Sequence, residues 1–237
     1  MTTIRYSGCK GFTLAELTIV LVIVALLVGG MLVPLSAQRD LQDIRETQRQ
    51  LSDITEALLG YAASNRSTVG ENPYLPCPDT DGDGSENRNA AGECFNDEGR
   101  LPWSDLGVGR EDAWGNRFRY RVLKDYSNGK TGFTLKTAAS SAVSMRACED
   151  AACTTVIASH LPAVVVSHGK NGDGAFNVSG GTNPAPAGAD EAANQNGDDK
   201  FVLHPPSSVP GSEFDDLVAW VSPYVLFNRM ISAGRFQ

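Results

Sequence analysis

Positive charge is scarce in this sequence. Its 237 residues include 20 lysines and arginines against 28 aspartates and glutamates, which gives a formal net charge of −8 at pH 7. A protein that binds the phosphate backbone of a nucleic acid needs a basic surface, so we expect no nucleic-acid partner. The acidic balance suits either solubility outside the cytoplasm or the binding of cations, and charge alone does not separate these two uses.

Motifs of the common enzyme classes are also missing. The sequence contains no GxxxxGK[ST] phosphate loop, no HExxH zinc motif and no GxSxG nucleophile turn. The three histidines, His160, His168 and His204, have no spaced partners that would distinguish a catalytic triad from surface histidines. We therefore expect that the protein is not an enzyme.

Cysteine pairs with CxxC spacing are absent, which disfavours a zinc site. Cys9 lies near the N-terminus, and the other four cysteines are Cys77, Cys94, Cys148 and Cys153. Four cysteines allow three pairings, and closeness in the sequence favours the first with the second and the third with the fourth. Metal binding or free thiols are the alternatives. Disulfide bonds would imply an oxidising compartment.

Charged residues are absent from Leu17 to Leu35, a run of 19 residues. About 20 apolar residues in a helix span the hydrocarbon core of a bilayer, so the run predicts a membrane-spanning helix. Arg5 and Lys10 precede it, and no acidic residue stands beside them. The positive-inside rule then keeps the N-terminus in the cytoplasm and sends the rest of the chain across the membrane.

One carboxylate, Glu16, stands at the start of this apolar segment. An acid within the membrane costs about 3 kcal/mol on insertion scales, and it marks a functional residue that needs a partner. A conventional secretory signal is the alternative, with a shorter uncharged core and a small-residue cleavage site. Residues 35–37 (LSA) are a poor site of that kind, and Glu16 argues against this alternative.

The stretch GFTLAEL, residues 11–17, followed by the apolar helix, resembles the N-terminal motif of type IV prepilins and of the pseudopilins of type II secretion. The resemblance implies that a prepilin peptidase cuts after Gly11 and that the new N-terminal residue, Phe12, is then N-methylated. It also implies that Glu16 pairs with the N-terminal amine of a neighbouring subunit during assembly. Two charges that are costly alone in lipid are tolerable as a pair.

This interpretation divides the chain into four parts. Residues 1–11 form the leader peptide, residues 12–35 the transmembrane half of a long helix, and residues 36–66 its amphipathic half. Pro34 is expected to loosen or kink the helix. Residues 67–237, which we term the head, form a periplasmic, β-rich globular region. The expected fold class is α+β and type IV pilin-like: the helix packs on an antiparallel β-sheet with long, disulfide-stapled loops.

Local patterns place the main elements of the head. Alternating or continuous apolar residues predict the strands 117–123, 161–167, 201–204 and 217–221. The pair Ser222-Pro223 then predicts the start of a short helix, with serine as the N-cap and proline in the first turn.

The segment DAWGN, residues 112–116, resembles the block that enters the sheet in pseudopilins. The pair Gly115-Asn116 is expected to make the turn, and Trp103 and Trp114 to cap the core. Carbohydrate binding by the two tryptophans is the alternative, and core packing is the commoner role of such side chains.

Two acidic segments are candidate calcium sites. In the first, Asp79, Asp81 and Asp83 alternate ahead of Gly84, like the first half of a calcium loop. The twelfth position of an EF-hand should be a bidentate glutamate, and here it is Ala90, so the segment is not an EF-hand. The alternative is a solvated turn rich in aspartate and glycine.

The second acidic segment lies toward the C-terminus. In the major pseudopilins a calcium ion holds the loop between the last strands, and the resemblance suggests a similar use here. The spacing departs from the short loop of that family, so no ligand set is carried over. The alternative is that these acids are surface charges that keep the protein soluble. The acidic residues of this segment are Asp190, Glu191, Asp198, Asp199, Asp215 and Asp216.

The function expected from these features is that of a structural subunit of a type II secretion pseudopilus or a type IV pilus. The subunit is inserted in the bacterial inner membrane as a single-pass protein and joins a filament after leader cleavage. Its mature length of 226 residues (237 minus 11) is large for the most abundant component and favours a minor subunit.

The expected partners are other pilins or pseudopilins, the prepilin peptidase and methyltransferase, the inner-membrane assembly platform and membrane lipid. The first alternative is a minor pilin that acts as an adhesin, with a ligand-binding tip module. The second is a secreted soluble protein with a conventional signal.

Overall fold

The computed structural model describes residues 11–137 and 144–236, with the backbone alone for residues 30–37. The chain divides into two compact units, Met1–Asp43 and Ile44–Gln237. The helices are α1 Leu14–Ser64, α2 Trp103–Leu106, α3 Lys124–Ser127, α5 Ala189–Ala193 and α6 Pro223–Ser232. The strands are β1 Glu98–Arg100, β2 Arg119–Val122, β3 Met145–Cys148, β4 Val156–Leu161, β5 Ala163–Ser167, β6 Lys200–Val202, β7 Ser207–Val209, β8 Ser212–Phe214 and β9 Leu217–Val221.

The first unit consists of a short non-helical segment, residues 11–13, and the N-terminal part of α1. The side chains of residues 11–29 are exposed. The helix continues through Pro34, so this proline does not end it. Nowhere in the described part of the chain is there a helical stretch with the length and apolar character needed to cross a membrane. The structure therefore does not show the predicted transmembrane half.

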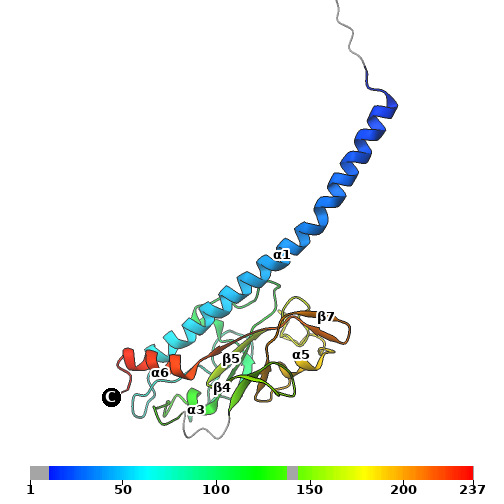
Figure 1. Ribbon diagram of the computed structural model, residues 1–237. Coiled ribbons are helices and arrows are strands. Elements are labelled where there is room, and N and C mark those ends of the chain that lie inside the picture. Colours follow the sequence, from blue (N-terminus) through cyan, green and yellow to red (C-terminus); the bar gives the residue numbers. More distant parts are fainter. Residues whose placement is uncertain (1–10, 138–143, 237) are drawn as a thin grey trace, which may run out of the picture. The chain divides into compact units, whose positions relative to one another are not determined.

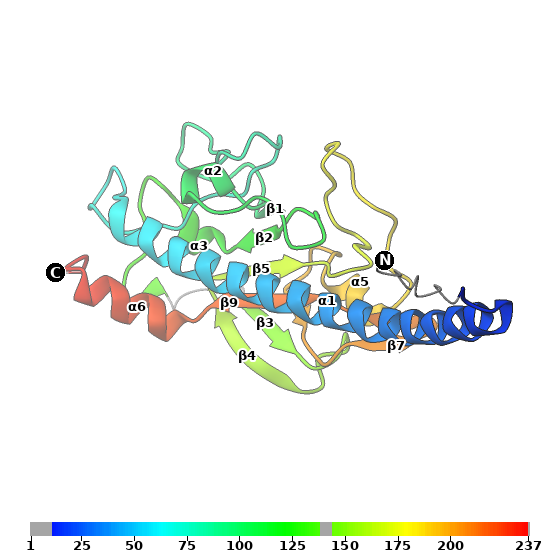
Figure 2. The same cartoon turned by 90° about the horizontal axis from the view of Figure 1, so that it is seen from above.

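The C-terminal part of α1 is amphipathic, as the sequence predicts, and belongs to the second unit. Its buried apolar side chains include Leu51, Ile54, Leu58 and Ala62, which recur at spacings of three and four. Figures 1 and 2 show this part of the helix lying along the strands, with the C-terminal helix α6 beside its end. An ion pair between Arg229 of α6 and Glu56 of α1, at 2.6 Å, joins the two helices.

The main sheet is antiparallel throughout and has the order β1-β2-β5-β9. Strand β5 is central and buried along its whole length, which explains its continuous apolar sequence. Its Val165 pairs with Tyr120 of β2 on one side and with Ala219 of β9 on the other. The side chains of α1 and of this sheet belong to one hydrophobic core. An α+β fold with the helix packed on an antiparallel sheet was predicted, and it is confirmed.

Two smaller sheets complete the second unit. One has the order β4-β3-β6, in which β3 and β6 run parallel, and the other is the β7-β8 hairpin. Strand β4 leads directly into β5, and Pro162 stands between them at the point where the chain passes from one sheet to the next. A proline suits this position because it donates no ladder hydrogen bond.

The strongest local patterns predicted the elements best. Strand β9 and the start of α6 are found at the predicted residues, and Ser222 is the N-cap, although its side chain makes no capping hydrogen bond. Strands β2 and β5 are found within the predicted bounds but are shorter, and β6 begins one residue before its predicted start and ends two residues before its predicted end. Strand β4 was not predicted, because its side chains are mostly exposed and lack a regular apolar alternation.

Two disulfide bonds close loops of the head, with the pairing that sequence closeness favoured. Cys77 is bonded to Cys94 and Cys148 to Cys153, with Cα–Cα distances of 5.2 and 5.0 Å. The first bond staples the loop that contains the acidic residues 79–83, and Cys77 is fully buried. The second closes a tight turn between β3 and β4.

Removal of the first disulfide should destabilise the head more than removal of the second. The bonds span sequence separations of 17 and 5 residues. Loop-closure entropy then gives a loss of about 3 kcal/mol for Cys77→Ala/Cys94→Ala and about 2 kcal/mol for Cys148→Ala/Cys153→Ala. Urea unfolding followed by tryptophan fluorescence measures both, because all three tryptophans lie in the head. A larger loss from the second pair would contradict this ranking.

Candidate functional site

The predicted processing site lies directly ahead of α1. Gly11, Phe12 and Thr13 are non-helical, and Phe12 is 86% exposed. An exposed peptide bond outside regular structure is the kind of substrate that a protease reaches. The position of the Gly11–Phe12 bond is therefore compatible with cleavage there.

Glu16 forms a reciprocal pair with Thr13 at the start of the helix. The backbone N–H and the hydroxyl of Thr13 both donate to Glu16 Oε2, each at 2.8 Å. The backbone N–H of Glu16 donates to Thr13 Oγ1 at 3.2 Å. This is a capping box, in which the N-cap residue and the residue three positions later satisfy each other's polar groups. The acid also suits the positive end of the helix dipole. Glu16 thus has a local structural role in addition to the role that the resemblance implies.

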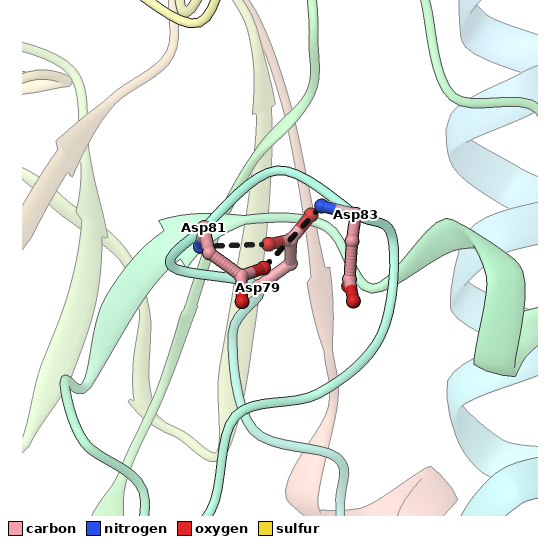
Figure 3. Close-up of side chains that lie close together, drawn as sticks. All are labelled: Asp79, Asp81 and Asp83. Atoms are coloured by element: carbon pink, nitrogen blue, oxygen red, sulfur yellow. Dashed lines mark hydrogen bonds between the residues drawn. The ribbon is translucent and has the colours of Figure 1, made fainter.

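The first acidic loop is organised around Asp79 (Figure 3). This side chain is fully buried, and its Oδ1 accepts hydrogen bonds from the backbone N–H groups of Asp81 and Gly82, at 3.1 and 2.6 Å. Its Oδ2 accepts one from the N–H of Gly84, at 2.9 Å. Asp81 and Asp83 are exposed and accept backbone hydrogen bonds further along the turn.

The backbone conformation of residue 84 and its packing against Trp103 explain why this residue is glycine. Gly84 has φ 91°, and a Cβ atom built on it would lie 2.4 Å from the ring of Trp103. Carboxylate oxygens of Asp79, Asp81 and Asp83 lie within 4.8 Å of one another, a separation that suits a cation. Both oxygens of Asp79 already accept N–H groups, which is how aspartate stabilises tight turns. The geometry therefore favours the turn interpretation, and calcium binding here stays a prediction.

Three acids of the second segment come together from different elements. Glu191 lies on α5, whereas Asp215 and Asp216 link β8 to β9. Carboxylate oxygens of these three residues lie within 4.8 Å of one another. Glu191 and Asp216 are 1% and 2% exposed, respectively. We term these three residues the acidic cluster.

Hydrogen bonds hold part of each carboxylate in the acidic cluster. The side-chain amide of Asn171 and the backbone N–H of Asp215 donate to Glu191 Oε1, at 2.9 and 3.0 Å. The amide of Asn194 donates to Asp216 Oδ2 at 2.8 Å. The backbone N–H of Asn171 donates to Asp215 Oδ2 at 2.9 Å. Asp215 Oδ1 is buried and accepts no hydrogen bond from the residues that the structure describes. Asp216 Oδ1 is also buried and lies 3.4 Å from His168 Nδ1. Carboxylate oxygens are the ligands that calcium prefers.

Burial and mutual repulsion act on the charges of the acidic cluster. Burial is the main cause that raises the pKa of Glu191, and the nearby charge of Asp216 adds to it. Burial likewise raises the pKa of Asp215, again with a contribution from Asp216. Both effects disfavour the ionised form, and a bound cation opposes both of them.

His168 lies next to the acidic cluster and is fully buried. Arg119 Nε donates to His168 Nε2 at 3.1 Å, and His168 Nδ1 lies 3.4 Å from Asp216 Oδ1. Since a guanidinium only donates, Nε2 must accept, and the neutral ring then carries its hydrogen on Nδ1, which faces Asp216. Arg119 is in turn paired with Glu98 of β1. The histidine therefore links the acidic cluster to the main sheet, a role that its sequence position did not reveal.

The other predicted acids of this segment lie elsewhere. Asp190 accepts the backbone N–H of Ala151 at 2.8 Å and contacts His204. Asp199 pairs with Arg121 at 2.8 Å, and Asp198 accepts the backbone N–H of Lys200 at 2.7 Å. The structure thus separates the six acids into one cluster of three and three residues with other partners. Asn171, which donates to Glu191 of the acidic cluster, was not predicted, although it stands in a loop rich in asparagine, aspartate and glycine.

The segment 112–116 forms the predicted turn and is fastened to the central strand. Asp112 Oδ1 accepts the backbone N–H groups of Trp114 and Asn116, at 3.0 and 2.9 Å. Its Oδ2 accepts the hydroxyl of Ser167 at 2.7 Å. The side-chain amide of Asn116 donates to the carbonyl of Gly169 at 3.0 Å. These bonds fix the start of the loop that leads to the acidic cluster.

Comparison with known families finds one match. The family model described as the prokaryotic N-terminal methylation motif matches residues 6–32. Comparisons with curated proteins and with solved structures gave no match. The motif supports a type IV pilin-like prepilin family, as the sequence predicted. It implies a membrane-anchored filament subunit that a prepilin peptidase processes and that assembles with other pilins, and it indicates a structural protein. It does not distinguish a secretion pseudopilin from a type IV pilin.

The acidic cluster predicts a specific dependence of stability on pH. Because the pKa values of Glu191 and Asp215 are raised in the folded state, their contribution is most favourable below the ordinary values of 4.5 and 3.8. It is lost as the pH rises through the raised values. In the metal-free protein, Glu191→Gln should therefore be stabilising relative to wild type at pH 7, and this advantage should shrink toward about pH 4.5.

Thermal unfolding in a chelator at pH 7, 6 and 5 measures this difference. Glu93→Gln is the matched control, because Glu93 is exposed and lies outside the acidic cluster. The control should show the same offset from wild type at each pH. A Glu191→Gln offset that stays constant over this range would contradict the raised pKa.

Proposed function

We propose that this chain is a minor structural subunit of a type II secretion pseudopilus or a type IV pilus. The observation that carries the proposal is the methylation motif at residues 6–32, in which Glu16 follows the cleavage junction Gly11–Phe12. In this proposal Phe12 is N-methylated, and Glu16 pairs with the N-terminal amine of a neighbouring subunit.

The proposed topology has the leader in the cytoplasm, residues 12–35 across the inner membrane and the head in the periplasm. The uncharged run from Leu17 to Leu35 supports the span, and Arg5 and Lys10 support its orientation. The two disulfide bonds of the head support an oxidising compartment. The proposed partners are other pilins or pseudopilins, the prepilin peptidase and methyltransferase, the assembly platform and membrane lipid.

We further propose that the acidic cluster binds calcium. Three carboxylates from two parts of the chain converge there, and the buried Oδ1 of Asp215 accepts no hydrogen bond from the described residues. The residues that would hold the ion are Glu191, Asp215 and Asp216. A bound cation would tie α5 to the segment between β8 and β9. Its role would be to order the long loop that connects β5 to β9 and to remove the repulsion among the three acids.

The adhesin alternative keeps the same anchor and differs only in the use of the head. Binding of the purified protein to glycans or to surfaces would favour it over a purely structural subunit. Processing near Ala37 in place of Gly11, seen by N-terminal mass analysis, would favour the secreted soluble protein.

The assembly role of Glu16 is tested by Glu16→Ala in cells that carry the matching assembly machinery. Leader cleavage should stay intact, because the cut lies ahead of the helix. Incorporation into sheared filaments should fall by at least about tenfold, which corresponds to 1.4 kcal/mol. Mass spectrometry of the N-terminus and immunoblots of the filament fraction measure the two effects. Glu46→Ala is the control, since Glu46 lies on the same helix in an exposed pair with Arg49. Normal incorporation of Glu16→Ala would remove the proposed role of Glu16.

Calcium binding is tested with the full chain in detergent, with unfolding followed by tryptophan fluorescence. Calcium at 100 times its dissociation constant should stabilise the head by about 2.7 kcal/mol, and a chelator should reverse the shift. Asp216→Asn should abolish the shift, whereas Asp83→Asn in the first acidic loop should retain it. No calcium shift in the wild type would end the proposal, and a shift lost only in Asp83→Asn would move the site to the first loop.

A further inference from the structure

The hydroxyl of Thr13 contacts Glu16 at two points. It accepts the backbone N–H of Glu16 at 3.2 Å and donates to Glu16 Oε2 at 2.8 Å. The same Oε2 also accepts the backbone N–H of Thr13, at 2.8 Å. One hydroxyl therefore fixes both the main chain and the carboxylate of Glu16, and these contacts restrict the rotation of a side chain that is otherwise flexible.

Both hydrogen bonds to the Glu16 carboxylate use the same oxygen, Oε2. Within the described ranges of the chain, Glu16 Oε1 accepts no hydrogen bond. The donors on Oε2 are neutral, so the carboxylate keeps its full negative charge. Oε1 thus remains open to a positively charged donor, and a charge-assisted hydrogen bond to a cation is among the stronger ones.

Leader cleavage does not break the contacts. The proposed cut lies between Gly11 and Phe12, and the amide N–H of Thr13 belongs to the next peptide bond, which is retained. The capping box can therefore exist both before and after processing. It also caps the helix at Thr13, the residue that follows the new N-terminal Phe12.

We propose that Thr13 is a positioning residue for Glu16: it holds Oε2 so that Oε1 is presented to the cationic N-terminal amine of a neighbouring subunit. This inference rests on the proposed function, in which Glu16 pairs with that amine. It adds that the orientation of the acid is set within the subunit before the partner arrives. Preorganisation of this kind strengthens pairing because less freedom is lost on contact.

The alternative is that Thr13 only starts the helix. Both roles need the Thr13 hydroxyl, and they are separated in a Glu16→Gln background, where a capping box can still form but there is no carboxylate to position. Thr13→Val removes the hydroxyl with little change of shape, and Thr13→Ser keeps it. Thr18→Val is the matched control, because the Thr18 hydroxyl donates to the carbonyl of Ala15, at 2.9 Å, and not to an acid.

The experiment measures incorporation into sheared filaments per cleaved subunit, with full-length chains expressed beside the matching machinery. Thr13→Val should lower incorporation at least about fivefold, because hydrogen bonds to charged groups are stronger than neutral ones. Thr13→Ser and Thr18→Val should stay within about twofold of wild type. In a Glu16→Gln background, Thr13→Val should cause no further loss, since the two residues act as one unit.

The outcomes separate the two levels of the proposal. If Glu16→Gln alone incorporates normally, the pairing role of Glu16 in the proposed function is wrong. If Glu16→Gln is impaired but Thr13→Val is normal, only the positioning role is overturned. The positioning role is also overturned if Thr13→Ser fails as badly as Thr13→Val, or if Thr13→Val lowers incorporation further in the Glu16→Gln background. Normalisation to cleaved subunits keeps any effect on the peptidase out of the comparison.

Discussion

The burial of one face of α1 against the main sheet is the contact on which the second unit depends. Leu51, Ile54 and Leu58 are almost fully buried there, in one core with the valines of β5. Each such side chain contributes about 1.5–3 kcal/mol when it is removed from water. An isolated four-stranded sheet with these side chains would expose a large apolar face, so the helix and the sheet stabilise each other. The disulfide bonds and the hydrogen-bonded loops are attached to the core that α1 and the main sheet form together.

Buried polar groups then connect the loops to that scaffold. Asp112 binds Ser167 at the end of β5, and Arg119 of β2 reaches the acidic cluster through His168. Such groups are stable in a core only when hydrogen bonds or ion pairs satisfy them. Among the described residues, Asp215 Oδ1 of the acidic cluster departs from this rule, because it is buried and accepts no hydrogen bond. At Asp79, by contrast, both carboxylate oxygens accept backbone N–H groups.

The sequence predicts this fold best where a local pattern decides the structure. The Ser222-Pro223 pair places the start of α6, and the spacing of Thr13 and Glu16 is itself the signature of a capping box. The acidic cluster is different, because Glu191 and Asp215 are far apart in the sequence and meet only through tertiary packing. Strand β4 is likewise determined by its pairing with β3, since its own side chains are mostly exposed. Long-range contacts of this kind produce no periodic pattern in the sequence.

Strands β5 and β9 are neighbours in the sheet, yet residues 168–216 separate them in the chain. That excursion holds α5, β6 and the β7-β8 hairpin, and its two ends are fixed side by side by the β5-β9 ladder. The entropy of closing a loop grows only with the logarithm of its length, so material added at this point costs the sheet little. The head can therefore lengthen or shorten here without a change in the register of β5 and β9 or in the packing of α1 on the main sheet. The excursion is thus a part of the head in which chain length can vary at little cost to the main sheet.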